Sequence, residues 1–302
     1  MSSTIHIPEI STAMNNIMSI DVEDWFHLLE LESTPDIDRW STLESRVERT
    51  FLKLLEEFDE TGVKVTCFFL GWVAERFPDL VRRAHASGHE VASHGYGHQL
   101  VYTQSRDQFA ADIRRSKAIL EDIAGAKVSG YRAPGFSVTE DTSWAFDEIA
   151  SAGFEYDSSV FPAARGHGGI RDGNISPYWV ETESGPLLEL PMSVLPVLGQ
   201  RLFVFGGGYL RLTPYRIIDL LSRSVNRSGR PVIYYLHPRE IDPGHPRLSM
   251  GLVRKFKSYV NMRSTMPKLR RLLRDQRLLP FREWLAENGH GYEQDKKEIP
   301  LH

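Results

Sequence analysis

Apolar segments with strand-like and helix-like spacing alternate along the first half of this 302-residue chain. Strand patterns lie at 17–24, 63–70, 89–94, 128–134 and 154–161, and helical patterns lie at 41–62, 73–88, 105–125 and 141–153. Such alternation is typical of parallel strands that are joined by crossover helices. The sequence therefore predicts an α/β fold with a parallel sheet, either open or closed into a barrel.

The pattern changes after about residue 162. Residues 163–196 are expected to form loops and short antiparallel strands. The glycine-rich segment 206–209 suits either a tight turn or a place where a ligand approaches the backbone. A helical pattern at 215–229, an apolar strand pattern at 231–238 and a basic helical tail follow. This third of the chain is expected to depart from the simple alternation.

Neither a low-complexity linker nor an internal repeat interrupts the chain. We therefore predict a flexible segment over 1–15 and a single domain over 16–290, within which residues 162–285 form a modified C-terminal part. The only cysteine, Cys67, stands in an apolar run and is expected to be a buried small hydrophobic residue, so no intramolecular disulfide is possible.

Composition limits the classes of function. The chain is 41% hydrophobic and 25% charged, which is ordinary for a globular protein, and its net charge of -4 provides no basic footprint for nucleic acid. The N-terminus lacks a signal-peptide pattern, and no stretch reaches the roughly 18 apolar residues of a membrane span. We expect a soluble, cytoplasmic protein, with the basic helix face at 268–275 as a candidate contact with a membrane surface.

Two histidines stand four residues apart in the sequence SHGYGH, at the end of a predicted strand. The spacing of His94 and His98 lets two imidazoles reach one cation. Gly95 and Gly97 favour a single tight turn there rather than a long helix. Taken alone, the pair is a weak signal, and the alternative is two exposed or hydrogen-bonded loop histidines.

Three acids end the first predicted strand, and they are natural donors of a third metal ligand. They are Asp21, Glu23 and Asp24. A catalytic zinc site typically has three protein ligands and one open position. Carboxylates that are crowded beside apolar residues repel one another unless a cation neutralises them. The alternative is an ordinary charged strand end.

Other chemically active side chains also fall at the ends of predicted strands. Arg132 in GYRAPGF can clamp a carboxylate, and His237 in YYLHP is well placed for acid–base chemistry. Asp157 likewise ends a strand pattern. Barrels build their active sites at the carboxyl ends of their strands. We therefore expect these groups to meet at one mouth of the fold.

The ordered motifs SIDVED, SHGYGH, GYRAPGF, YDSS and YYLHP together resemble the polysaccharide deacetylases of carbohydrate esterase family 4, the NodB-homology domain. The later stretches at 206–215 and 234–247 are similar to the branch associated with exosortase and exopolysaccharide loci. The resemblance implies a deformed (β/α) barrel with about seven strands.

The resemblance also implies roles for individual residues. His94 and His98 match the metal-binding histidines. Asp21 matches the general base, and Arg132 matches the arginine that holds this base. His237 matches the proposed general acid.

Three further residues are implied to contact the substrate. The backbone N–H of Gly135 matches an oxyanion donor, and Phe136 and Tyr209 are candidates for the wall that faces the sugar. Other aromatic candidates for that wall, Trp25, Phe26 and Trp179, are more readily explained as core residues.

The first motif departs from the family, because Val22 stands where the family carries a second aspartate as metal ligand. Side chains alternate along a strand, so Glu23 shares a face with Asp21 and could provide the missing ligand. If the strand ends earlier, Asp24 could turn in instead. The sequence leaves both alternatives open.

The resemblance implies a metal-dependent hydrolase that removes N-acetyl groups from an N-acetylated oligosaccharide or polysaccharide in exopolysaccharide assembly. Two imidazoles and a carboxylate suit Zn²⁺, with Co²⁺, Ni²⁺ and Mn²⁺ as alternatives. Two competing hypotheses remain: an allantoinase-like amidohydrolase that acts on a small amide, and a catalytically inactive glycan-binding module.

Overall fold

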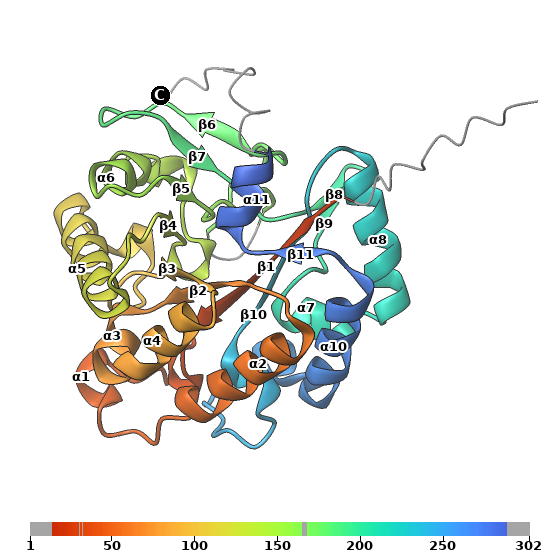
Figure 1. Ribbon diagram of the computed structural model, residues 1–302, viewed down its shortest axis with the longest axis horizontal. Coiled ribbons are helices and arrows are strands. Elements are labelled where there is room, and N and C mark those ends of the chain that lie inside the picture. The colour runs from red at the N-terminus through yellow and green to blue at the C-terminus, as the bar shows by residue number, and fades with distance from the viewer. Residues whose placement is uncertain (1–13, 30, 32, 165–167, 289–302) are drawn as a thin grey trace, which may run out of the picture.

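The computed structural model describes residues 14–29, 31, 33–164 and 168–288, so most of the segment 1–15 lies outside the described residues. One curled sheet occupies the centre of the described part (Figure 1). Its strands are β1 (Asn16–Val22), β2 (Thr66–Phe69), β3 (Glu90–Ser93), β4 (Gly130–Tyr131), β5 (Tyr156–Asp157), β6 (Tyr178–Val180), β7 (Leu187–Glu189), β10 (Ile233–Leu236) and β11 (Leu278–Leu279).

The strand order is β10-β1-β2-β3-β4-β5-β7-β6, and β11 pairs with the start of β1. Every pair from β10 to β7 is parallel, whereas β6 runs antiparallel to β7. No ladder joins β10 to β7 or β6 in the described ranges, so the curled sheet is a half-barrel. The prediction of an α/β fold of the deformed-barrel type is confirmed.

Helices surround this sheet (Figure 1). They are α1 (Ile37–Trp40), α2 (Val47–Thr61), α3 (Gly71–Arg76), α4 (Pro78–Ala86), α5 (Arg106–Ala124), α6 (Ala145–Ser151), α7 (Gly207–Leu212), α8 (Tyr215–Arg227), α9 (Leu252–Tyr259), α10 (Thr265–Asp275) and α11 (Phe281–Asn288). Because both faces of the parallel sheet are covered, β1 is buried along its whole length. Cys67 on β2 is buried, as expected.

Two helix boundaries differ from the sequence pattern. The helix expected from residue 41 begins at Val47, where the carboxylate of Asp24 accepts hydrogen bonds from the first backbone N–H groups. The helix expected over 73–88 is divided at Phe77 into α3 and α4. Pro78 explains this break, because proline lacks an N–H group and disfavours helical backbone at the preceding residue.

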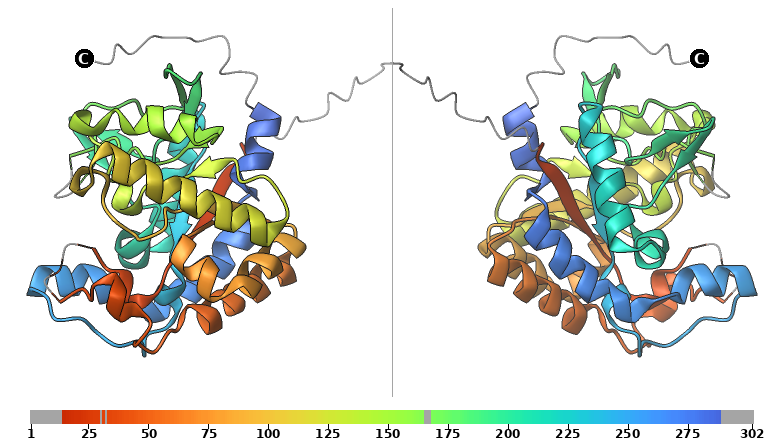
Figure 2. Two further views of the ribbon diagram at one scale, coloured as in Figure 1. Left: turned by 90° about the vertical axis from the view of Figure 1, so that its left-hand side faces the viewer. Right: turned by 90° about the vertical axis from the view of Figure 1, so that its right-hand side faces the viewer.

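The C-terminal part belongs to the same sheet, because β10 pairs with β1 over four residues. It also forms the antiparallel hairpin of β8 (Leu195–Val197) and β9 (Gln200–Leu202). The antiparallel pair of β6 and β7 lies within 163–196, where short antiparallel strands were expected. In Figure 2, the right-hand view shows β1 between α8 and the C-terminal helices. Among the described residues, no helix combines the length and the apolar character that a membrane crossing requires.

The glycine-rich segment 206–209 begins helix α7 and does not form a tight turn. A Cβ atom at Gly206 would lie 2.0 Å from the ring of Tyr235 on β10. Glycine therefore allows the start of α7 to approach β10, and an isolated parallel bridge joins Gly206 to Tyr235. This approach brings Gly207, Gly208 and Tyr209 to the carboxyl end of the sheet.

Candidate active site

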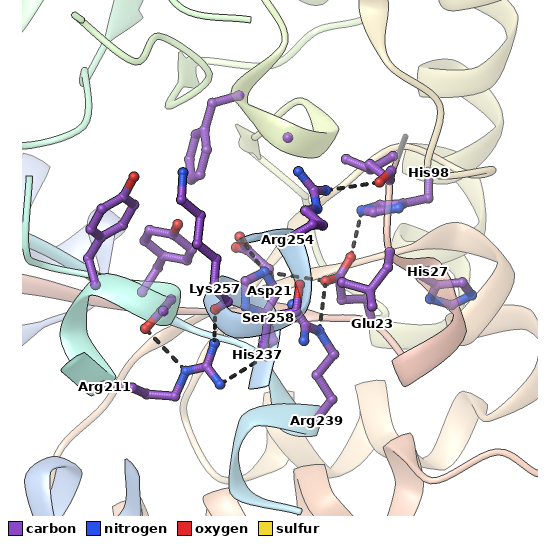
Figure 3. A pocket seen from close by; sticks show the side chains of 18 of the residues that line it. Asp21, Glu23, His27, His98, Arg211, His237, Arg239, Arg254, Lys257 and Ser258 are labelled. Carbon is purple, nitrogen blue, oxygen red and sulfur yellow. Dashed lines mark hydrogen bonds and ion pairs between the residues drawn. The ribbon is translucent and has the colours of Figure 1, made fainter. Parts of the chain in front are cut away.

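A cavity of about 640 Å³ opens at the carboxyl ends of the parallel strands. Asp21 and Glu23 reach it from the end of β1, His94 from the end of β3, and His237 from the end of β10. Figure 3 shows the side chains that line it. Residues that are up to 216 positions apart in the sequence therefore face one space, because their strands are parallel neighbours.

Glu23, His94 and His98 form a cluster in which one ligand atom of each lies within 4.8 Å of the others. All three side chains are buried. Oε2 of Glu23 lies 2.6 Å from Nε2 of His98. Burial on its own raises the pKa of Glu23, but His98 and His237 more than offset this and hold the pKa well below its usual value. Glu23 is therefore an ionised carboxylate.

The ring of His94 is oriented by the backbone. Its Nδ1 lies 2.7 Å from the carbonyl oxygen of Arg132, and because a carbonyl only accepts, Nδ1 carries the proton. Burial lowers the pKa of His94 to about 4, so the imidazole is neutral near pH 7. Its Nε2 then has a free lone pair, which is the form that binds a metal ion.

The turn that carries His98 is held by a residue from another helix. Asp112 of α5 accepts hydrogen bonds from the backbone N–H groups of Tyr96 (2.7 Å) and Gly97 (3.0 Å). Gly95 has a φ of 73° and His98 a φ of 51°, both in the left-handed region. A positive φ is uncommon for a residue other than glycine, so His98 is held in a strained backbone by its surroundings.

Asp24 lies outside the cluster. Beyond Val22 the backbone turns, and the Asp24 carboxylate accepts hydrogen bonds from Ser45 Oγ (2.6 Å) and from the N–H groups of Arg46 (2.8 Å) and Val47 (3.1 Å). All three of these bonds go to Oδ2, and Oδ1 accepts from the N–H of Trp25 at 2.8 Å, so both oxygens are committed away from the histidine cluster. Of the two alternatives that the sequence left open, the structure brings Glu23 to the histidines.

Asp21 is held by Arg132 at the base of the cavity. Nη1 of Arg132 donates to Oδ1 of Asp21 at 2.7 Å and to Oγ of Ser19 at 2.8 Å. Arg132 is fully buried, and its guanidinium lies 4.1 Å from the ring centre of Phe68. Oδ2 of Asp21 remains on the cavity side, 4.0 Å from Nε2 of His237.

His237 lies between two carboxylates. Its Nδ1 is 2.6 Å from Oε1 of Glu240, and its Nε2 is 3.3 Å from Oε1 of Glu23. Burial would lower the pKa of His237, but Glu23 and the hydrogen bond to Glu240 raise it above the ordinary value. Glu240 is in turn paired with Arg211 at 2.8 Å. This arrangement favours a protonated imidazole whose Nε2–H faces the cavity.

The aromatic candidates divide into two groups. Phe136 and Tyr209 line the cavity together with Gly135. Gly135 and Phe136 have φ angles of 65° and 54°, so a left-handed turn presents this segment. Trp25 and Phe26 are buried in a small apolar cluster and do not line the cavity. Trp179 on β6 packs against the main core instead.

Sequence reasoning missed the residues that support the site from a distance. Asp112 and Arg211 lie on helices far along the chain from the groups that they hold, so no local pattern indicated them. Glu240 follows His237 by three residues and forms a capping box with it, which is a spacing that could have been recognised. Asp157 ends its strand as predicted but is buried away from the cavity.

The cluster suits a divalent metal ion. Two imidazoles and one carboxylate converge from a strand end and a tight turn. The hydrogen bond from Nδ1 of His94 to the backbone oxygen of Arg132 fixes the tautomer that leaves Nε2 free for a metal ion. Three protein ligands that face a cavity leave room for a water molecule or substrate beside the ion. The donor set matches zinc chemistry better than that of calcium or magnesium, which prefer oxygen ligands.

Two family models match consecutive parts of the chain. Residues 34–156 match the family described as polysaccharide deacetylase, and residues 158–286 match a domain of unknown function, DUF3473. Asp21 and Glu23 precede the first match, and His237 lies within the second. The groups that face the cavity are thus drawn from both matched regions and from β1.

Over 97 residues the chain is 31% identical to a peptidoglycan-N-acetylglucosamine deacetylase of Bacillus cereus, covering 32% of this chain and 35% of that protein. The matches span about a third of the length of such curated relatives. A protein from Mycobacterium smegmatis that is assigned to the polysaccharide deacetylases superposes with a TM-score of 0.64 at 22% identity, covering 99% of this chain and 97% of that one. An allantoinase, Puue, gives 0.59 at 14% identity, covering 97% and 94%. These two likenesses show the fold.

Proposed function

We propose that the chain is a metal-dependent N-deacetylase that acts on an N-acetylated glycan or glycan precursor, because residues 34–156 match the polysaccharide deacetylase family. One observation carries the proposal: the Glu23–His94–His98 cluster, the Asp21–Arg132 pair and His237 all face one cavity. The relatives named as peptidoglycan and chitin deacetylases support the reaction type. We place the glycan in exopolysaccharide assembly on the sequence resemblance of residues 206–215 and 234–247.

Glu23, His94 and His98 would hold the metal ion, with Zn²⁺ as the best match to the donor set. When bound, such an ion supplies Lewis acidity toward an acetamide carbonyl and acidifies a water molecule. Asp21 is positioned to accept the proton of the attacking water, because Arg132 fixes one of its oxygens and leaves the other toward the cavity.

His237 and the backbone take part in the protonation of the leaving group and the stabilisation of the oxyanion. Protonated His237 donates a proton to the leaving amine, and Glu240 keeps its ring oriented through Nδ1. In this proposal a backbone N–H near Gly135, which lines the cavity, stabilises the developing oxyanion. The products are acetate and a free amino sugar. Phe136 and Tyr209 provide apolar faces on which a sugar ring can pack.

Acetate release from N-acetylated oligosaccharides tests the proposal. The zinc-loaded protein should release acetate, and chelation of the metal or the Asp21→Asn substitution should abolish the release. Asp79→Asn is the matched control, because Asp79 is exposed on α4. Allantoin, offered in parallel, tests the small-amide alternative. Oligosaccharide binding without acetate release would instead favour a glycan-binding module and would contradict the proposal.

A further inference from the structure

Three buried arginines lie in or beside the cavity, and two of them have their hydrogen bonds satisfied. Arg132 donates to Asp21, Ser19 and Ser158. Arg211 is paired with Glu240 and donates to the backbone oxygens of Gly207, Lys257 and Ser258. Both guanidinium groups therefore hold other residues of the site in place, and each of their nitrogen atoms already has a partner.

Arg239, the third, is different. It lies in the single turn Pro238–Ile241 that follows His237, and only 9% of it is exposed. Its Nε and Nη1 atoms are buried and have no hydrogen-bond partner among the described residues. The carboxylate of Glu23 is 3.9 Å from Nε, but His98 and His237 already contact it. A buried guanidinium with unused N–H groups is costly unless a ligand satisfies them.

Two more cations face the same space from α9. Arg254 is half-buried and donates to the backbone oxygen of Leu29 at 2.9 Å, and Lys257 is exposed. Figure 3 shows both side chains above the carboxylates of the site. Asp21 and Glu23 are the carboxylates that line the cavity within the described ranges, and both are already paired. The wall formed by the C-terminal part therefore carries an excess of positive charge.

We propose that Arg239, Arg254 and Lys257 form a subsite for an anionic group of the substrate. The inference rests on the proposed function and narrows it to an N-acetylated sugar that carries a carboxylate or phosphate near the acetamido group. The planar guanidinium of Arg239 suits two oxygens of such a group, whereas Lys257 acts as a point charge. The alternative role of Arg239 is to balance the charge of Glu23 alone, which would give no preference for anionic sugars.

Binding to the zinc-loaded Asp21→Asn protein, followed by NMR titration, separates these two roles without turnover. The probes are N-acetylglucosamine, N-acetylmuramic acid and N-acetylglucosamine 1-phosphate, so that the carboxylate and the phosphate are tested in separate arms. We expect at least one anionic sugar to bind about 10-fold or more tightly than the neutral sugar. Arg239→Gln should remove about 10- to 100-fold of that advantage, which is the range for charge-assisted hydrogen bonds, and leave the neutral sugar unaffected.

Arg216→Gln is the matched control, since Arg216 is exposed on α8 and does not line the cavity. If Arg239→Gln does not fold, the Arg254→Gln/Lys257→Gln double variant carries the same test from the cavity rim. Equal binding of all three sugars, or an unchanged anionic advantage in the variant that is measured, would overturn the inference. If the anionic subsite fails this test but neutral oligosaccharides still release acetate, the proposed function stands and only the subsite is wrong. If anionic sugars bind selectively but no substrate releases acetate, the subsite stands and the proposed function is wrong.

Discussion

Glu23 and Asp24 are adjacent at the end of β1, but their carboxylates have different partners. Glu23 faces two imidazoles, whereas Asp24 is bound to the first turn of α2. The period of a strand predicts that Asp21 and Glu23 share a face, and this much followed from the sequence. The sequence could not show that Asp24 turns away toward α2, because its partners there, Ser45 and Arg46, stand more than 20 residues later.

A pair of alanine substitutions separates these two roles. Glu23→Ala should abolish stoichiometric zinc binding, because it removes one of three ligands. Asp24→Ala should keep the zinc but lower the free energy of unfolding by about 1–2 kcal/mol, because a helix cap is lost. Elemental analysis after dialysis and denaturant unfolding measure the two effects. Loss of zinc in Asp24→Ala with retention in Glu23→Ala would reverse the assignment of the ligand.

His237 is expected to act on the leaving group and not on the metal. His237→Ala should retain zinc and slow acetate release by about 10²–10⁴-fold, as for a positioned general acid. Glu240→Gln should produce part of the same loss, because it weakens the group that orients the imidazole. Steady-state kinetics on zinc-saturated protein checks both variants. Full activity in His237→Ala would mean that another group protonates the amine.

At the scale of elements, β5 and β7 bring two acids together in the core. Asp157 and Glu189 are paired in register and are both fully buried, and among the described residues Oδ2 of Asp157 and Oε2 of Glu189 have no other hydrogen-bond partner. Two neighbouring carboxyl groups can satisfy these oxygens by sharing a hydrogen bond, which requires a proton on one of them. The strand pattern predicted Asp157 at a strand end, but β7 was not recognised as its neighbour, so the sequence suggested a role in the active site.

This pair gives a pH dependence of stability. Burial raises the pKa of Asp157 and of Glu189, and the neighbouring Asp157 carboxyl raises that of Glu189 further. The folded state therefore binds more protons than the unfolded state, and this contribution to stability falls as pH rises above the ordinary carboxyl range, about 4. In Glu189→Gln the fall should be smaller. Thermal unfolding of the unsubstituted protein and of Glu189→Gln, measured from acid to mildly alkaline pH, tests this prediction. If the stability of the two proteins changed identically with pH, the shared proton would be contradicted.

At the scale of the whole molecule, the two matched regions build one sheet. β10 comes from the region 158–286, yet it pairs with β1 next to β2 and β3 of the region 34–156. The alternation of strands and helices predicted the class of fold and the end of the sheet at which Asp21, His94 and Arg132 meet. Strand order and the placement of Arg211, Arg239 and Asp112 depend on contacts distant in sequence, so local patterns could not supply them.

The shared sheet predicts that the matched regions do not fold separately. A chain cut after residue 157 loses β10, which is paired with β1, and β7, which is paired with β5. Both fragments would expose long unpaired strand edges and buried apolar surface. Neither should show a cooperative unfolding transition, as followed by near-ultraviolet circular dichroism and denaturant titration. A cooperative transition in the fragment 1–157 would show that the regions are independent domains.

The account depends most on a metal ion at the mouth of the half-barrel. Anomalous X-ray scattering from crystals of the zinc-loaded protein, recorded at the zinc absorption edge, tests this directly. The account predicts one strong peak about 2.0–2.2 Å from a carboxylate oxygen of Glu23 and from one ring nitrogen each of His94 and His98. A cavity without a peak under saturating zinc, or a peak bound elsewhere while both imidazoles remain free, would contradict it.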